Sequence, residues 1–509
     1  MLKRIRVILA TIVFALITLV FLDFTGTIHV WFSWLAKIQF LPAVLALNVI
    51  VVAVLVILTL LLGRIYCSVI CPLGIMQDII ARLNRKKNRY SYSGEKRVLR
   101  YAVLVVFVVL LVVGLGAFAA LLAPYSSYGR IAENLLRPVY LFGNNILASI
   151  AEHFNSYAFY HADVWIKSLP TFIIAAVSFV VIGYLAWRGG RTYCNTICPV
   201  GTVLSFFARF SLFKIYFDED KCRKCSKCSK NCKASCIDYK NMTVDYSRCV
   251  TCGNCLEQCS FDALHFGMRA KKKVERGERN EERNEERTGK QGVDEGKRAF
   301  LLGAALATTG AAIAQVKKKT DGGLAVIEDK EAPNRTTPIT PPSSYSAKNM
   351  AQHCTACQLC VSECPNEVLR PSTDLMTLMQ PTMSYERGYC RPECNRCSEV
   401  CPTGAIEPIK KEDKTSIQIG HAVWVKHQCI PVMTDADKDQ ETVECGNCAR
   451  HCPTGAILMV PLREDDEESP MVPTVNAAKC IGCGACENLC PARPFPAIYV
   501  EGHEMHRVL

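Results

Sequence analysis

The chain carries two copies of one cysteine spacing, CRKCSKCSKNC at residues 222–232 and CVTCGNCLEQC at residues 249–259. Each copy reads C-x2-C-x2-C-x3-C. Three thiolates at this spacing wrap one face of a [4Fe–4S] cluster, and the fourth ligates a neighbouring cluster. Zinc sites use two spaced pairs of ligands instead. The spacing therefore predicts two clusters, one held by Cys222, Cys225, Cys228 and Cys259 and the other by Cys249, Cys252, Cys255 and Cys232.

The last third of the chain repeats this chemistry with four more cysteine sets, each ending in a Cys-Pro pair. Six sets of four, two C-x3-C-P pairs and Cys236 account for all 29 cysteines. A disulfide scaffold of the kind found in small secreted proteins is therefore not indicated. The sixteen further predicted ligands are Cys354, Cys357, Cys360, Cys364, Cys390, Cys394, Cys397, Cys401, Cys429, Cys445, Cys448, Cys452, Cys480, Cys483, Cys486 and Cys490.

The first part of the chain, residues 1–205, is apolar enough to enter a membrane. Runs near Val7–Phe24, Leu41–Leu62, Tyr101–Ala123 and Pro170–Trp187 each approach the roughly 20 residues that cross a bilayer. Basic residues precede the first run and lie between the second and third, which predicts that both ends of this four-helix unit are cytoplasmic. We interpret the basic residues behind the net charge of +12 as signals of membrane topology and not as residues that bind nucleic acid.

An internal repeat follows the second and fourth apolar runs. GRIYCSVICPLG at residues 63–74 and GRTYCNTICPVG at residues 190–201 agree at eight of twelve positions. The repeat brings Cys67, Cys71, Cys194 and Cys198 to one membrane depth. Together they can hold a metal or cluster, form disulfides or react with a redox partner, and the alternative is that they are small buried apolar residues. We expect an additional redox or metal site here, of unknown identity.

The two cluster domains, residues 206–268 and 349–509, are separated by segments of different composition. Residues 269–298 form a charged linker with no apolar face. Residues 299–314 form a signal-like apolar segment that ends in Ala-Ile-Ala, and a Pro/Thr/Ser-rich spacer follows at residues 315–348. If residues 299–314 direct export, the two-cluster domain is cytoplasmic and the four-cluster domain is periplasmic. If they form a short helix on a cytoplasmic domain instead, both cluster domains lie on one side of the membrane.

Four apolar spans, two C-x3-C-P motifs and a two-cluster segment resemble the NapH/MauN type of membrane iron–sulfur protein. Residues 349–509 resemble the NapG/MauM type, through PTVNAAKCIGCGACENLCP (473–491) and CNRCSEVCPTGAI (394–406). One departure is that Cys232 is followed by Lys-Ala-Ser-Cys and not by proline, which leaves Cys236 as an alternative ligand. In the second domain, the resemblance implies that the first and fourth motifs exchange their last cysteines, and that the second and third motifs do the same.

These resemblances imply a multi-domain fold, with a four-helix transmembrane unit and α+β ferredoxin-like [4Fe–4S] domains, in a bacterial inner membrane. The implied function is a quinol dehydrogenase component that passes electrons from the membrane quinone pool through six [4Fe–4S] clusters to an extracytoplasmic redox protein. Because no dinucleotide-binding, P-loop or nucleophile motif accompanies the clusters, no catalytic residue is predicted. The alternative is a redox or metal-handling maturation factor for a metalloenzyme.

Overall fold

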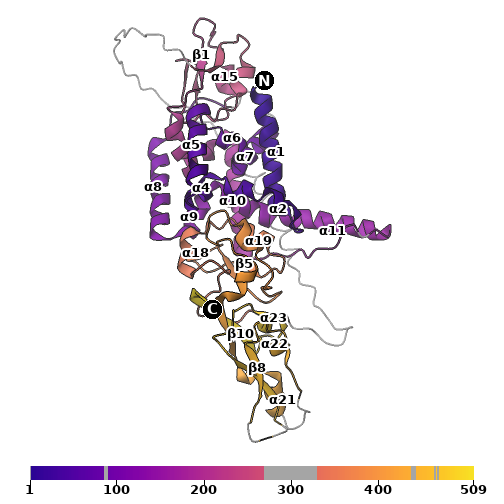
Figure 1. Ribbon diagram of the computed structural model, residues 1–509. Coiled ribbons are helices and arrows are strands. Elements are labelled where there is room, and N and C mark those ends of the chain that lie inside the picture. The colour runs from indigo at the N-terminus through magenta and orange to yellow at the C-terminus, as the bar shows by residue number, and fades with distance from the viewer. Residues whose placement is uncertain are drawn as a thin grey trace, which may run out of the picture.

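The described residues of the computed structural model form an elongated molecule with three parts. They are residues 2–84, 90–156, 158–268, 329–436, 443–463, 466 and 469–509. A two-cluster segment caps one end, a unit of helices occupies the middle, and a four-cluster segment extends from the other end (Figure 1). The predicted charged linker (269–298) and signal-like segment (299–314) lie outside the described residues.

The helical unit is built around the two copies of the repeat. In each copy a short helix carries the first cysteine, and the second cysteine immediately precedes a helix that begins with proline, which suits the first helical position because it needs no N–H there. Its helices are α1 (Leu2–Leu22), α2 (Thr27–Phe32), α3 (Trp34–Lys37), α4 (Phe40–Leu45), α5 (Val49–Leu62), α6 (Tyr66–Val69), α7 (Pro72–Leu83), α8 (Arg97–Val113), α9 (Gly116–Leu122), α10 (Pro124–Ile131), the π-helix η1 (Ala132–Leu136), α11 (Arg137–His153), α12 (Leu169–Gly189), α13 (Thr192–Thr196) and α14 (Pro199–Ala208).

The four predicted spans differ in length. In the described residues, Lys3–Leu22 of α1 and Leu169–Gly189 of α12 are the helices long and apolar enough to cross a membrane. The second and third predicted spans are each broken, at Leu47 (φ 51°) between α4 and α5 and at Gly114 (φ 86°) between α8 and α9. Helix α5, with 14 residues, is about 21 Å long, less than the roughly 30 Å hydrocarbon core. The predicted four-helix transmembrane unit is therefore not confirmed for these two runs, each of which forms two shorter helices.

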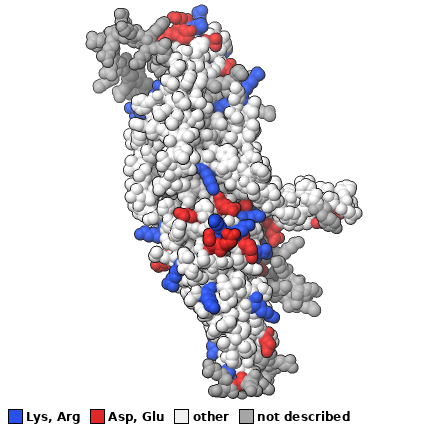
Figure 2. All heavy atoms as spheres, in the orientation of Figure 1, with Lys and Arg blue, Asp and Glu red and all other residues white. Residues whose placement is uncertain are grey.

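The outward faces of the helices are apolar. Val105, Val109 and Val112 of α8 are 60%, 52% and 80% exposed, and α12 likewise exposes Val177 and Tyr184. On the face shown in Figure 2, charged side chains gather at the top of the molecule and around its middle, at and below the level of the protruding helix α11, and are sparse over the helices between these two zones. An exposed apolar surface of this extent indicates a site that contacts lipid or protein.

The two-cluster segment is a small α+β unit whose strands pair across its length. Its core consists of Ile215, Ile237 and Leu264, packed against cysteine side chains. Strand β1 pairs antiparallel with β4, with Ile215 opposite Phe266, and β2 pairs with β3. The elements are β1 (Lys214–Phe217), α15 (Lys227–Lys230), β2 (Ile237–Asp238), β3 (Thr243–Val244), α16 (Asn254–Gln258) and β4 (Leu264–Gly267).

The four-cluster segment is built from short helices and two-stranded antiparallel sheets. Strand β7 pairs with β10, with Ala422 opposite Val500, and β5 pairs with β6 and β8 with β9. The elements are α18 (Ala347–His353), α19 (Leu359–Glu363), β5 (Leu369–Pro371), β6 (Pro381–Met383), α20 (Arg396–Val400), the 3-10 helix η2 (Glu412–Ser416), β7 (Ile417–Trp424), the 3-10 helix η3 (Lys426–Gln428), α21 (Ile430–Ala436), α22 (Asn447–Arg450), β8 (Ile457–Pro461), β9 (Met471–Val475), α23 (Ala485–Leu489) and β10 (Ile498–Val508).

The described end of the predicted spacer is part of this segment. Ile339 is 1% exposed, and its carbonyl accepts a hydrogen bond from the N–H of Met383 at 2.9 Å. Arg335 forms an ion pair with the buried carboxylate of Glu487. These contacts correct the expectation of a loose spacer: residues 329–346 pack onto the four-cluster segment, because their apolar and charged side chains find partners there.

Candidate iron–sulfur sites

Two sites lie in the two-cluster segment. Site 1 is a cavity lined by Cys222, Cys225, Cys228 and Cys259 and closed by apolar side chains such as Phe217. Cys225 is exposed, so a cluster here would lie close to the surface. The described structure thus groups the three cysteines of the first motif with the last cysteine of the second, as the spacing predicts.

Site 2 groups Cys249, Cys252 and Cys255 with Cys232. The Cys252 and Cys255 thiols both interact electrostatically with Cys232 and Cys249. The Cys236 sulfur lies 3.5 Å from the Cys232 sulfur and also hydrogen-bonds to the Cys249 thiol. Because Cys252 and Cys255 interact with Cys232 and not with Cys236, this geometry favours Cys232 as the fourth ligand and makes Cys236 a hydrogen-bonding neighbour of the Cys232 and Cys249 sulfurs.

The sixteen cysteines of the four-cluster segment fall into four groups. In each, three cysteines of one motif are joined by the last cysteine of its neighbour in the sequence. The groups are site 3 (Cys354, Cys357, Cys360 and Cys401), site 4 (Cys390, Cys394, Cys397 and Cys364), site 5 (Cys480, Cys483, Cys486 and Cys452) and site 6 (Cys429, Cys445, Cys448 and Cys490).

This grouping corrects the pairing that the family resemblance implies. The first motif exchanges its last cysteine with the second and not with the fourth, and the third exchanges with the fourth. Site 5 makes the difference plain, because Cys452 lines one cavity with Cys480, Cys483 and Cys486. The physical reason is local: each pair of consecutive motifs packs as its own two-cluster lobe, so the exchange partner is the nearest motif in the chain.

Backbone amides point at several of these sulfurs. A hydrogen bond to a ligand sulfur stabilises the reduced, more negative cluster and so raises its reduction potential. The polypeptide therefore sets part of each potential through its backbone. The donor N–H groups and their acceptors are Ala263 to Cys259 at 3.2 Å, Ala356 to Cys354 at 3.4 Å, Ala456 to Cys452 at 3.2 Å and Ala497 to Cys490 at 3.3 Å.

The sites form a line from one end of the molecule to the other. Cys228 of site 1 interacts with Cys255 of site 2, and Cys360 of site 3 interacts with Cys397 of site 4. Site 4 touches site 5 through Cys390, whose N–H donates to the Cys483 carbonyl at 2.9 Å. Sites 1 and 2 lie at one end of the helical unit, site 3 lies beside the other end, and site 6 lies toward the far tip (Figure 1).

The four repeat thiols, Cys67, Cys71, Cys194 and Cys198, come together between sites 2 and 3. Each is 4% exposed, all four are free, and the Cys198 thiol interacts electrostatically with the other three. No three His, Cys, Asp or Glu side chains of the described residues converge closely enough for a single metal ion. A cluster spreads its ligands over a cube and needs them farther apart than one ion does.

The four-cluster segment docks on the helical unit through polar contacts that sequence reasoning missed. His29 of α2 lies between two carboxylates, with Nδ1 2.5 Å from Glu363 and 3.4 Å from Asp23. Burial opposes a charge on His29, but these carboxylates outweigh it and raise the pKa of the imidazole. Asn134 also donates to Gln358 at 2.8 Å. The one sequence feature that could have indicated these contacts is that polar residues interrupt the apolar runs near the predicted outer loops.

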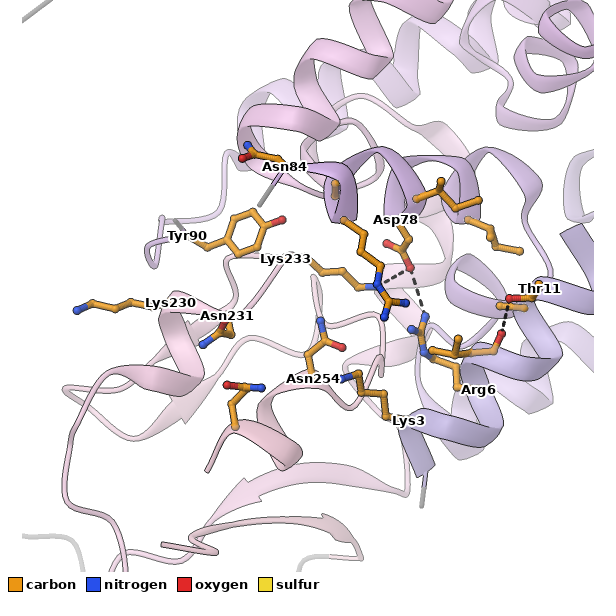
Figure 3. Close-up of a pocket in the computed structure, with 17 residues that line it drawn as sticks. Lys3, Arg6, Thr11, Asp78, Asn84, Tyr90, Lys230, Asn231, Lys233 and Asn254 are labelled. Carbon is orange, nitrogen blue, oxygen red and sulfur yellow. Dashed lines mark hydrogen bonds and ion pairs between the residues drawn. The ribbon is translucent and has the colours of Figure 1, made fainter. Parts of the chain in front are cut away.

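The two-cluster segment docks through the carboxylate of Asp78 on α7. It accepts from Arg191 Nε at 2.7 Å and from Arg6 at 3.2 Å, and it pairs with Lys233, the residue after Cys232. Beside this network is a cavity of about 340 Å³ between α1, α7 and the two-cluster segment (Figure 3). Apolar residues of α1 and α7 form one side of the cavity, and polar residues next to site 2 form the other.

Three family models match parts of the chain. A model described as a 4Fe-4S binding domain matches residues 44–90 and again residues 169–217, the two copies of the repeat. A 4Fe-4S dicluster domain model matches residues 443–493, and a second 4Fe-4S binding domain model matches residues 242–265. The dicluster match spans parts of the third and fourth motifs, which is consistent with sites 5 and 6 forming one lobe.

Curated relatives match about a third of the chain. The methylamine utilization ferredoxin-type protein MauM of Methylobacillus flagellatus is 30% identical over 175 residues, which are 33% of this chain and 70% of that protein. The ferredoxin-type proteins NapF and NapG of Escherichia coli are each 27% identical, over 32% and 36% of this chain and 87% and 80% of their own lengths. No solved structure matches the chain.

These matches agree with the geometry of the sites. An iron–sulfur electron carrier holds its clusters with groups of four cysteines, surrounds the cysteine sulfurs with backbone hydrogen bonds and places the sites next to one another. The described residues have all three features. The relatives are ferredoxin-type proteins, and the matched family models bind 4Fe-4S clusters. The chain therefore belongs to the family of MauM-type ferredoxin proteins and is a 4Fe-4S electron-transfer protein.

Proposed function

We propose that the chain carries electrons across a membrane, from quinol on its cytoplasmic side to an acceptor protein on the other side. One observation carries this proposal: sites 1 and 2 lie at one end of the helical unit and sites 3 to 6 extend from the other end. The helices between them have exposed apolar faces suited to lipid. A soluble electron carrier would need neither feature.

The proposed membrane unit includes the two broken helices with α1 and α12. Broken helices are tolerated at membrane depth where the freed backbone groups find hydrogen-bond partners, and here the Leu47 N–H donates to the Val44 carbonyl at 3.1 Å and the Leu115 N–H to the Leu110 carbonyl at 2.8 Å. Lys3, at the start of α1, pairs with Glu257 of the two-cluster segment at 2.5 Å. The basic residues at the start of α1 support the proposed orientation, with sites 1 and 2 in the cytoplasm and sites 3 to 6 outside.

Quinol would enter through the cavity between α1 and α7. Val7, Ala10, Ile75 and Ile79 form an apolar side suited to a ring and its tail. Lys233, on the opposite side, interacts with the Cys252 thiol of site 2. A quinol bound there would give two electrons, one at a time, to site 2, and release two protons toward the cytoplasm.

Quinol-dependent reduction of the clusters tests this function. Inner-membrane vesicles containing the full chain are mixed anaerobically with a quinol analogue, and cluster reduction is followed by electron paramagnetic resonance. Ile79→Trp fills the cavity and should slow reduction by quinol at least tenfold, while dithionite still reduces every cluster. Val54→Trp, on an exposed face of α5 away from the cavity, is the matched control and should have no effect.

Two results would contradict the proposal at different points. Failure of quinol to reduce the clusters of the unsubstituted chain would reject the quinol function. Normal quinol reduction in the Ile79→Trp variant would reject the cavity alone. Reporter fusions at residues 287 and 346 test the topology, because a membrane-crossing carrier requires them to report opposite sides.

A further inference from the structure

The two copies of the repeat pack against each other with reciprocal contacts. Arg64 of the first copy donates from Nη2 to the Cys194 carbonyl at 3.0 Å, and Arg191 of the second donates from Nη1 to the Cys67 carbonyl at 2.6 Å. The two arginines are thus related by an approximate two-fold axis. The four repeat thiols lie around this axis, two from each copy.

Glycines make this close approach possible. A Cβ on Gly74 would lie 2.3 Å from the Cys67 carbonyl oxygen and 2.5 Å from Arg191 Nη1. A Cβ on Gly201 would meet the Cys194 carbonyl and the Arg64 guanidinium at 2.4 and 2.7 Å in the same way. The last glycine of each copy is therefore needed so that the arginine of the other copy can reach the thiols.

Hydrogen-bond donors converge on the sulfurs from several directions. Arg64 Nη2 lies 3.8 Å from the Cys67 sulfur, and Arg191 Nη1 lies 3.8 Å from the Cys194 sulfur. The Gln77 amide nitrogen lies 3.3 Å from the Cys194 sulfur, and the Gln77 amide oxygen lies 3.6 Å from it. Uncharged thiols are weak acceptors and do not need such a set, whereas the sulfurs of a metal cluster accept hydrogen bonds that orient them and set their potential.

Charge gives an independent argument. Arg64 is fully buried, and its hydrogen bonds to Asn195 at 2.9 Å, Ser247 at 3.1 Å and Cys194 are all to neutral acceptors. Among the described residues no carboxylate pairs with Arg64, and its Nε has no partner. A buried charge without a counter-charge is expensive. Site 2 contributes negative charge through Cys249, and a cluster ligated by four thiolates at the repeat would supply a counter-charge directly beside the guanidinium, whereas disulfides or neutral thiols there would not.

We propose that Cys67, Cys71, Cys194 and Cys198 together hold one [4Fe–4S] cluster, with two ligands from each copy of the repeat. Arg64, Arg191 and Gln77 are its positioning residues. Each copy alone supplies two cysteines, too few for a cluster, so the match of both copies to one 4Fe-4S binding model is explained by a single shared site. The type of cluster follows that model.

The position of this cluster suits a relay between the two ends of the molecule. On one side, Arg64 contacts the repeat thiols and also interacts with Cys249 of site 2. On the other side, Tyr193 lies by the repeat thiols, and Arg130 interacts with both Tyr193 and Cys357 of site 3. One electron would pass from site 2 to this cluster and on to site 3, with no bond made or broken. The relay role rests on the proposed function, but the cluster itself does not.

Iron and sulfide analysis of the full chain, purified anaerobically in detergent, tests the site. Seven clusters of four predict about 28 iron and 28 sulfide per chain. The Cys71→Ser/Cys198→Ser double variant should lose about four of each and one paramagnetic signal. Thr59→Val, at a buried polar side chain of α5 outside the repeat, is the control and should keep the full content. Equal iron in the double variant and the unsubstituted chain, or copper or a disulfide at the repeat thiols, would overturn the proposal.

A second variant keeps the test valid if the double variant does not fold. Arg64→Gln removes a positive charge but no ligand, so the iron content should remain about 28 per chain. Because Arg64 lies beside both site 2 and the repeat thiols, the reduction potentials of two clusters should fall, that of the repeat cluster by about 59 mV or more, a tenfold change in its one-electron equilibrium. If no cluster besides site 2 shifts, the proposed site is wrong. Quinol reduction measured on the same samples separates this outcome from failure of the proposed function.

Discussion

Replacing Asp78 with asparagine should undock the two-cluster segment from the helical unit. Asp78 is the only carboxylate among the described residues that pairs with Arg191, Arg6 and Lys233. Arg191 is 1% exposed, and the side chains of Arg6 and Lys233 are 9% and 7% exposed. The substitution removes the charge, keeps the shape and leaves three buried cations facing one another.

The size of the effect follows from this burial. Removing one partner of a buried ion pair costs about 3–5 kcal/mol, because an uncompensated charge remains. Lys233 belongs to the two-cluster segment, and Arg191 immediately precedes α13 of the helical unit. The lost stabilisation therefore weakens the contact between these two parts of the molecule. At 1.4 kcal/mol per factor of ten, the population of the undocked state should rise by about 100-fold to 4,000-fold.

Hydrogen–deuterium exchange of the detergent-solubilised chain measures this population. Amides at the contact should exchange faster in Asp78→Asn by a comparable factor, including the N–H of Arg191, which donates to the Lys233 carbonyl at 2.8 Å. Asp218→Asn is the control, because Asp218 pairs with the exposed Lys221 at 3.5 Å and an exposed pair contributes at most about 1 kcal/mol. Unchanged exchange in Asp78→Asn, or an equal effect in both variants, would refute the reasoning.

Three further predictions concern the ligands and the docking of the four-cluster segment. Cys232→Ser should lose or convert one cluster by electron paramagnetic resonance, whereas Cys236→Ser should change no cluster type; the reverse result would make Cys236 the ligand. Cys452→Ser should expose Cys480 to alkylation, detected by mass spectrometry, whereas labelling of Cys390 would restore the pairing implied by the family resemblance. His29 has a raised pKa, so its ion pairs stabilise docking fully below its ordinary pKa of about 6.5 and this contribution is lost as pH rises through the folded-state pKa. The Tm difference between the unsubstituted chain and His29→Gln should therefore shrink toward alkaline pH, and a constant difference would contradict this.

The sequence by itself determined the features that depend on neighbouring residues. Three ligands of each cluster lie within one short turn, so the spacing of Cys222, Cys225 and Cys228 already implies a cluster. The repeat was equally visible, because Arg64 and Arg191 occupy the same position in two matching stretches. The apolar runs of α1 and α12 likewise predicted two helices of membrane-spanning length.

Only the tertiary structure decided which distant residues meet. The fourth ligand of each site comes from another motif, and spacing alone does not distinguish Cys452 from Cys364 as the partner of Cys480. Docking of the two ends depends on charges far apart in the chain, such as His29 and Glu363. In each case the deciding energy comes from long-range packing and the burial of charge, which a local pattern does not record.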